Sequence, residues 1–143
     1  MNAPSRAPVH LTRAGVSVVL GRDDHGVPVV LHWGAALGDL DDAGLAALAT
    51  ARRPGASHSA YDGPRSTGLV PDGARGYSGT PALAGHRVGG SATAAAPSLV
   101  DWDVRADDAS VTCSSTDDEA GWAVRVELSL DEAGLLHART SVT

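Results

Sequence analysis

The chain has no lysine, and this absence excludes several kinds of chemistry. All eleven basic residues are arginines and stand against 17 acidic residues, so the formal net charge is −6. Without lysine there is no phosphate-loop lysine, no Schiff base and no kinase-type ion pair. Clustered positive charge supplies most of the affinity for nucleic acids and for anionic membrane surfaces. We therefore expect neither a nucleic acid nor a membrane as a partner.

Cysteine and long apolar runs are also scarce. Cys113 is the single cysteine, so it has no partner for an intrachain disulfide. The six histidines lack metal-ligand spacing, which predicts no metal and no cofactor. Residues 1–8 lack the apolar run of a secretory signal, and no later run is long enough to span a membrane. We expect a cytoplasmic protein.

The first third of the chain has the pattern of β-strands. A length of 143 residues favours one domain, which we place at 9–143 after a flexible 1–8 segment. Val16–Leu20 and Val27–Leu31 are rich in β-branched residues, and Asp23–Gly26 between them has hairpin turn chemistry. Val9–Leu11 predicts a further strand. Because Pro28 has no amide donor, its strand should lie at an edge or start at the proline.

The middle of the chain changes character twice. Leu40–Arg53 predicts a short helix that Asp41 or Asp42 caps, with Leu40, Leu45 and Leu48 roughly on one face. The stretch Pro54–Pro97 is rich in glycine and proline, and no sustained apolar alternation survives in it. It predicts a loop excursion with one or two short strands around Leu69–Val70.

The last third returns to strands, which are predicted at Leu99–Val104, Ser110–Ser114, Trp122–Leu130 and Leu135–Thr143. In Trp122–Leu130 apolar and polar residues alternate, which is typical of a strand with one buried face. The fold class is mostly β: an antiparallel β-sandwich of the supersandwich type, with one short helix and a long Gly/Pro-rich loop region. The chain stops inside or just after its last strand, so we expect a domain truncated at its C-terminal end.

Catalytic residues are not expected. Glycosidases use paired carboxylates. Each adjacent acidic pair here falls in a predicted turn or helix start, where acidic residues cap the backbone and promote solubility. Gly76-Tyr77-Ser78-Gly79 resembles a nucleophile elbow, but its second glycine does not stand at the spacing that this motif requires. It predicts a turn.

A sugar site is the chemistry that the remaining residues favour. Aromatic rings offer flat apolar faces to a pyranose, and arginine and histidine donate to its hydroxyls. Trp33 could equally be a core anchor, and Arg87 could instead attach the loop to the sandwich. The candidate rim of a substrate-binding site consists of Trp33, Arg53, His58, Tyr61, His86 and Arg87.

Two stretches carry a family resemblance. His32-Trp33-Gly34-Ala35-Ala36-Leu37-Gly38-Asp39 is similar to the strand-end motif of family 36 glycoside hydrolases, the bacterial α-galactosidases. The stretch from Leu69 to Arg87 resembles the Pro- and Gly-rich loop of the same N-terminal domain, and the Trp122–Arg139 hairpin fits its later strands. The resemblance covers nearly the whole chain. In that family a β-supersandwich precedes a (β/α)₈ barrel that carries both catalytic aspartates.

The resemblance implies a supporting role. The barrel is missing from this chain, and the Lys-Trp-Asp nucleophile motif cannot occur without lysine. The chain is therefore expected to be an inactive N-terminal fragment of an α-galactosidase-type enzyme. It would act as a scaffold and homo-oligomerisation domain and lend loop residues to the pocket for the α-galactoside substrate, which the missing barrel would bind. The alternatives are a free-standing carbohydrate-binding sandwich and a plain interaction domain.

Overall fold

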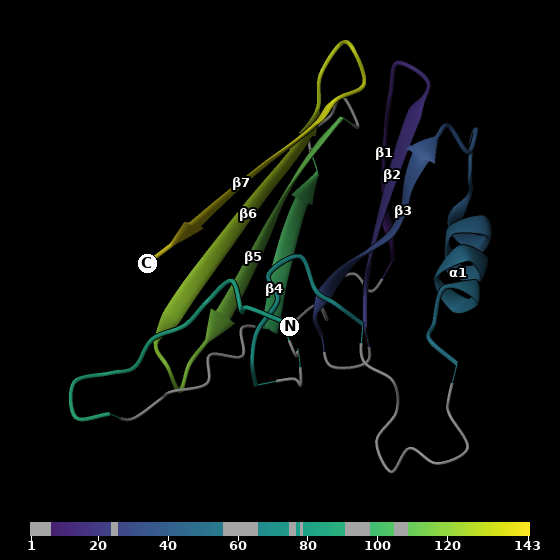
Figure 1. Cartoon of the computed structure of the whole chain (residues 1–143). Coiled ribbons are helices and arrows are strands. Elements are labelled where there is room, and N and C mark those ends of the chain that lie inside the picture. The colour runs from purple at the N-terminus through teal and green to yellow at the C-terminus, as the bar shows by residue number, and fades with distance from the viewer. Residues whose placement is uncertain are drawn as a thin grey trace.

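Two antiparallel sheets pack face to face, and a helix covers the outer side of the first (Figure 1). The computed structural model describes residues 7–23, 26–55, 66–74, 77, 79–90, 98–104 and 109–143. Within these residues the elements are β1 Val9–Arg13, β2 Val16–Arg22, β3 Pro28–Ala35, α1 Asp42–Ala51, β4 Ser98–Val104, β5 Ser110–Asp117, β6 Trp122–Leu130 and β7 Leu136–Val142. The predicted fold class, a mostly β sandwich with one short helix, is confirmed.

The first sheet is a meander in the order β1-β2-β3. The turn between β2 and β3 is held by Asp23, whose backbone N–H donates to Val27 O (2.9 Å) and whose side chain accepts from Val27 N–H (2.8 Å). Strand β3 lies at the edge and begins at Pro28. The missing amide of Pro28 therefore removes no hydrogen bond from the inside of the sheet, as predicted.

Strand β3 is longer than the sequence predicts, and it contains a bulge. It continues through His32 and Trp33 to Ala35, because β2 offers pairing partners along this whole length. Val18 pairs with Trp33 and Leu20 with Val30, which leaves Leu31 as an extra residue. Directly paired residues point to the same side of a sheet. The bulge thus places Val30 and Trp33 on one face, although their odd separation would put them on opposite faces of a regular strand.

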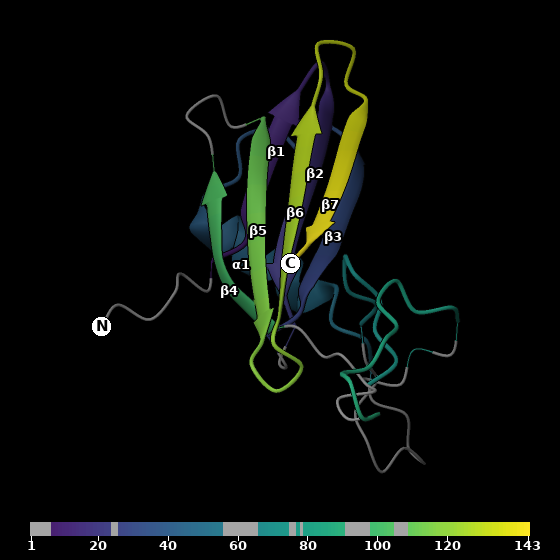
Figure 2. The same ribbon diagram turned by 90° about the vertical axis from the view of Figure 1, so that its left-hand side faces the viewer.

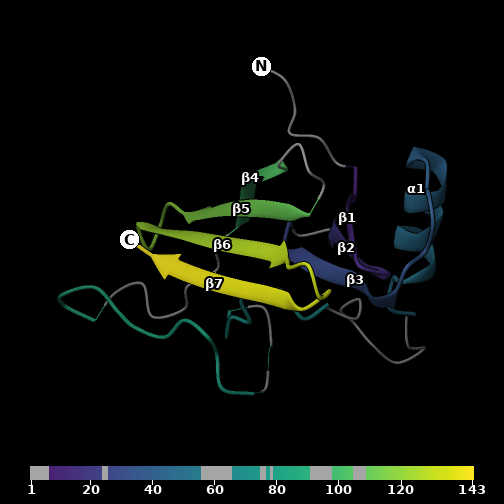
Figure 3. The same cartoon turned by 90° about the horizontal axis from the view of Figure 1, so that it is seen from above.

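The second sheet has the order β4-β5-β6-β7. In β6, the side chains of Val124, Val126, Leu128 and Leu130 are buried and those between them are exposed or half-buried, as the alternation predicts. The predicted Asp131–Gly134 hairpin loop is present, closed by Asp131 N–H to Leu135 O at 3.0 Å. Both β3 and β7 are edge strands and lie along the same side of the sandwich (Figures 2 and 3).

The core lies between the two sheets. Its buried members come from β1, β2, β5 and β6: Val9, Leu11, Val18, Leu20, Val111, Cys113, Val124, Val126, Leu128 and Leu130. The edge strands β3 and β7 contribute none of these buried core residues. Burial of apolar side chains is the main stabilising contribution to such a fold, so the centre of the sandwich is its most stable part.

Helix α1 begins as the sequence predicts. Asp41 is the N-cap, and its side chain accepts a hydrogen bond from Gly44 N–H (2.8 Å). Leu45 is the buried residue of the helix. The helix covers the outer face of β1, β2 and β3 (Figure 1). The chain between β3 and the helix is tied to that face by Ser17, whose hydroxyl accepts from Leu37 N–H at 3.0 Å.

The strands predicted around Leu69–Val70 are absent from the described part of 54–97, so this prediction is wrong. Only an isolated bridge pairs Asp72 with Leu83 there. Pro71 cannot donate to a sheet ladder, and Gly68 and Gly73 interrupt the apolar pattern on either side. Leu69, Val70 and Leu83 instead pack singly against the core. The expectation of a loop excursion holds for the residues that the structure describes.

Candidate functional site

A shallow pocket of about 480 Å³ wraps the free edge of β3. This volume lies within the usual range of small-molecule sites. The pocket combines an aromatic ring, two basic side chains, two hydroxyl groups and aliphatic walls. Its lining residues are Val29, Val30, Leu31, His32, Trp33, Arg52, Pro54, Ser66 and Thr67. We call this the β3-edge pocket.

Trp33 is the most exposed large aromatic of the pocket. Trp33 pairs with the buried Val18 of β2, so its side chain lies on the face of the first sheet that is turned toward the core. At the edge strand, however, 64% of Trp33 is exposed, and Val30 beside it is 43% exposed. The alternative that Trp33 is a core anchor is therefore wrong. An exposed indole is a flat apolar surface with a polar N–H at its rim.

Arg52 reaches the pocket because helix α1 ends beside it. Arg52 is the C-cap, and its backbone N–H donates to Leu48 O at 3.0 Å. Its side chain is exposed and lines the pocket. The neighbouring Arg53, which the sequence favoured, is exposed but does not line it. The position at which α1 ends thus brings Arg52, and not Arg53, to the pocket.

Ser66 and Thr67 are held at the pocket by the segment that follows them. Leu69 N–H donates to Pro28 O at 2.9 Å, which fixes this segment beside the start of β3. Gly68 permits the close approach, since a Cβ at this position would overlap the Val27 side chain. Two hydroxyl groups, which both donate and accept hydrogen bonds, therefore lie next to the apolar edge.

His32 has one ring nitrogen already engaged. Its Nε2 lies 3.1 Å from Ala35 O, and because a carbonyl only accepts, Nε2 must carry the proton. In the neutral ring this leaves Nδ1 as an acceptor for a hydroxyl group. The neutral His32 ring therefore adds an acceptor to a pocket in which the guanidinium of Arg52 only donates.

Among the other predicted rim residues, those that the structure describes do not line this pocket. His58 and Tyr61 lie outside the described residues. His86 and Arg87 do not line the pocket; the Nε of Arg87 donates instead to Ala120 O (2.7 Å) in the β5–β6 turn. The alternative that Arg87 attaches the loop to the sandwich is therefore the observed one. Of the six predicted residues, Trp33 lines the pocket.

Several pocket residues carried no signal in the sequence. Ser66, Thr67 and Pro54 belong to the Gly/Pro-rich stretch, where no periodicity predicts which side chains meet the sandwich. Arg52 and His32 are polar residues of the sequence, but only the end of α1 and the bulge of β3 bring them to the pocket. The usable signal in the sequence was the His32-Trp33-Gly34 run at the end of a predicted strand.

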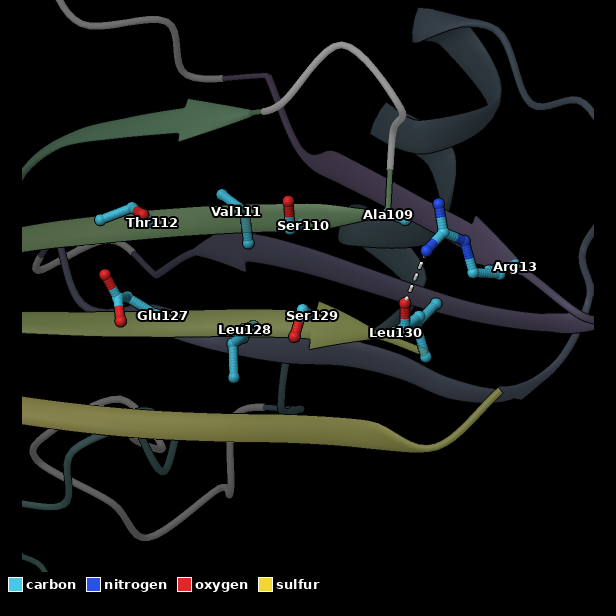
Figure 4. A pocket seen from close by; sticks show the side chains of 9 residues that line it. All are labelled: Arg13, Ala109, Ser110, Val111, Thr112, Glu127, Leu128, Ser129 and Leu130. Carbon is cyan, nitrogen blue, oxygen red and sulfur yellow. Dashed lines mark hydrogen bonds between the residues drawn. The ribbon is translucent and has the colours of Figure 1, made fainter. Parts of the chain in front are cut away.

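A second depression, of about 340 Å³, lies over the paired ends of β5 and β6 (Figure 4). Ser110, Thr112, Glu127 and Ser129 line it, and Arg13 closes one end by donating to Leu130 O at 3.3 Å. No aromatic ring is among its lining residues. It therefore lacks the flat aromatic surface that Trp33 gives the β3-edge pocket.

The described residues contain a Ser–His pair, but its serine is buried. Ser17 Oγ lies 2.8 Å from His10 Nε2, and Ser17 is fully inaccessible to solvent. A substrate could not reach this hydroxyl, so the pair supports the packing of the chain after β3. Over the same residues, no group of three or more His, Cys, Asp or Glu could hold a metal ion. No helix in this part is long and apolar enough to cross a membrane.

The chain was compared with protein-family models, with curated proteins and with solved structures, and none of them matches it. These comparisons therefore identify no family. The resemblance to the N-terminal domain of family 36 glycoside hydrolases remains a prediction from the sequence.

Proposed function

We propose that this chain is a non-catalytic, carbohydrate-binding β-sandwich domain that serves an α-galactosidase-type glycoside hydrolase. The observation that supports the proposal best is the exposed ring of Trp33 in the β3-edge pocket, beside Arg52 and His32. A pyranose has an apolar C–H face and a rim of hydroxyls, and this pocket has an aromatic surface with donors and acceptors around it. The link to a glycoside hydrolase rests on the sequence resemblance alone.

Binding is tested by titrating the chain with galactose and raffinose while following tryptophan fluorescence. We expect a saturable change that is lost in Trp33→Ala. Tyr77→Ala is the matched control, because Tyr77 is also an exposed aromatic but lies outside the pocket. Absence of saturable binding, or equal loss in both variants, would refute the carbohydrate-binding role.

The non-catalytic part has its own test. No aspartate or glutamate is among the described residues that line the β3-edge pocket, so no carboxylate pair of the kind that glycosidases use meets there. We expect the purified chain to leave p-nitrophenyl α-galactoside unhydrolysed. Hydrolysis that scales with chain concentration and survives repurification would overturn this part of the proposal.

A second candidate function, docking onto a catalytic (β/α)₈ domain, is favoured by the open side of the sandwich. Leu135, just before edge strand β7, and Val142, the last residue of β7, are 63% and 46% exposed, and Val30 is exposed on β3. Contiguous apolar patches mark interaction surfaces, and we propose that these side chains belong to one. The test is to add the chain to a family 36 α-galactosidase stripped of its own sandwich. Restored activity that Val142→Glu abolishes supports docking, whereas no restoration argues against it.

A further inference from the structure

The charge of the β3-edge pocket is opposite to that of the chain. The chain has a net charge of −6, yet the charged or basic side chains among the described lining residues are Arg52 and His32, and none is acidic. The nearest helical acids, Asp41 and Asp42, stand at the other end of α1, about 15 Å away for a ten-residue helix. The pocket is therefore a local positive site on an acidic protein.

The donors of the pocket also exceed its acceptors. Within the described residues no hydrogen bond or ion pair engages the Arg52 guanidinium, and Arg52 is exposed. Arginine has no acceptor, and its planar fork matches a carboxylate with two parallel hydrogen bonds. Sites for neutral sugars need acceptors for the hydroxyl protons of the ligand. Here His32 Nδ1 and the hydroxyls of Ser66 and Thr67 are the side-chain acceptors among the lining residues.

We propose that the β3-edge pocket takes an acidic sugar, a pyranose whose C6 is a carboxylate. Its ring lies on Trp33 and its carboxylate pairs with Arg52, while Ser66 and Thr67 contact hydroxyls. This inference rests on the proposed carbohydrate-binding function and specifies its ligand class. Three features of the described residues support it: the exposed indole of Trp33, the guanidinium of Arg52 without a described partner, and the absence of carboxylates among the described lining residues.

Two ligands that differ only at C6 test the inference. Methyl α-galactopyranoside and methyl α-galacturonate are titrated by calorimetry at pH 7. Because a charge-assisted bidentate pair is stronger than a neutral hydrogen bond, we expect the galacturonate to bind about tenfold more tightly. Raising the salt concentration should reduce this ratio, since the site is exposed.

Arg52→Gln should bring the ratio of the two Kd values to about one. Arg139→Gln is the matched control: it removes the same charge from an exposed arginine on β7 that does not line the pocket, and should leave the ratio unchanged. Circular dichroism and the unfolding midpoint establish that both variants fold.

Each outcome separates this inference from the proposed function. Equal binding of both ligands overturns the acidic-sugar inference and leaves the carbohydrate-binding role in place. Binding of neither overturns both. A ratio that persists in Arg52→Gln, or falls as much in Arg139→Gln, overturns the assignment of Arg52 as the carboxylate partner.

Discussion

The buried thiol of Cys113 makes the stability of this protein sensitive to alkaline pH. Cys113 lies in the middle of β5, between Trp102 of β4 and Val126 of β6 in the register, and it is fully buried in the core between the sheets. Burial raises the pKa of the thiol from 9.0 to about 11, because a thiolate loses its hydration there. The folded protein therefore holds on to a proton that the unfolded chain releases between pH 9 and 11.

The sign and size of the effect follow from this difference. Below pH 9 the thiol is protonated in both states and contributes no pH dependence. Above pH 9 the unfolded state ionises first, so the free energy of unfolding falls as the pH rises toward 11. Each pKa unit corresponds to about 1.4 kcal/mol, so we expect a loss of about 2 kcal/mol by pH 11.

Urea denaturation at several pH values between 8 and 11, for the wild type and for Cys113→Ala, measures this loss. Other groups titrate in the same range, but they are common to both proteins. The difference between the two unfolding free energies therefore isolates the thiol. A thiol reagent at pH 8 adds a second readout, since a buried thiol should react only after unfolding. A difference that is constant with pH, or a native thiol that reacts at the unfolded rate, would refute the burial of Cys113.

Three further predictions address the core, the helix start and the β6–β7 loop. Leu20→Ala should lower the free energy of unfolding by about 2–5 kcal/mol, because Leu20 is fully buried between the sheets; a loss below about 1 kcal/mol in urea denaturation would contradict the packing. Asp41→Ala should cost about 1 kcal/mol in the same assay through loss of the bond to Gly44 N–H, and Asp41→Asn should restore most of it. A hydrogen bond from His137 (2.9 Å), with backbone bonds from Leu135 and Ala133, holds the pKa of Asp131 below its ordinary 3.8. Because this pKa is lowered in the folded state, its contribution to stability is present above pH 3.8 and disappears as the pH falls through the folded value. An NMR titration of Asp131 should show a midpoint below 3.8 that rises in His137→Ala, and an unchanged midpoint would exclude His137 as the cause.

Local patterns predicted the strands well where one face of a strand is buried. The alternation of β6 survives in the structure because its partners β5 and β7 keep it in an inner position with one face toward the core. Pro28 at the start of an edge strand and Asp41 as a helix cap were predictable for a similar reason. In each case the cause lies in one residue and its neighbours in sequence.

The same local reasoning was wrong at Leu69–Val70. Two neighbouring apolar residues suggested a strand, but each packs against the core from a bend beside Pro71. Their burial comes from the position of the loop on the sandwich rather than from sheet pairing. No period in the sequence distinguishes these two origins of burial.

The sequence by itself determined that this is a mostly β protein, because β-branched alternation, a proline and a capped helix act through near neighbours. It also indicated Trp33 as a candidate residue of a substrate-binding site. Only the tertiary structure decided that Trp33 is exposed, that it shares a face with Val30 through the bulge at Leu31, and that Arg52 rather than Arg53 lies beside it. A bulge and an edge position are properties of pairing between strands, and the end of a helix meets a sheet edge only once both are packed. The site is therefore a product of non-local contacts that no window of the sequence contains.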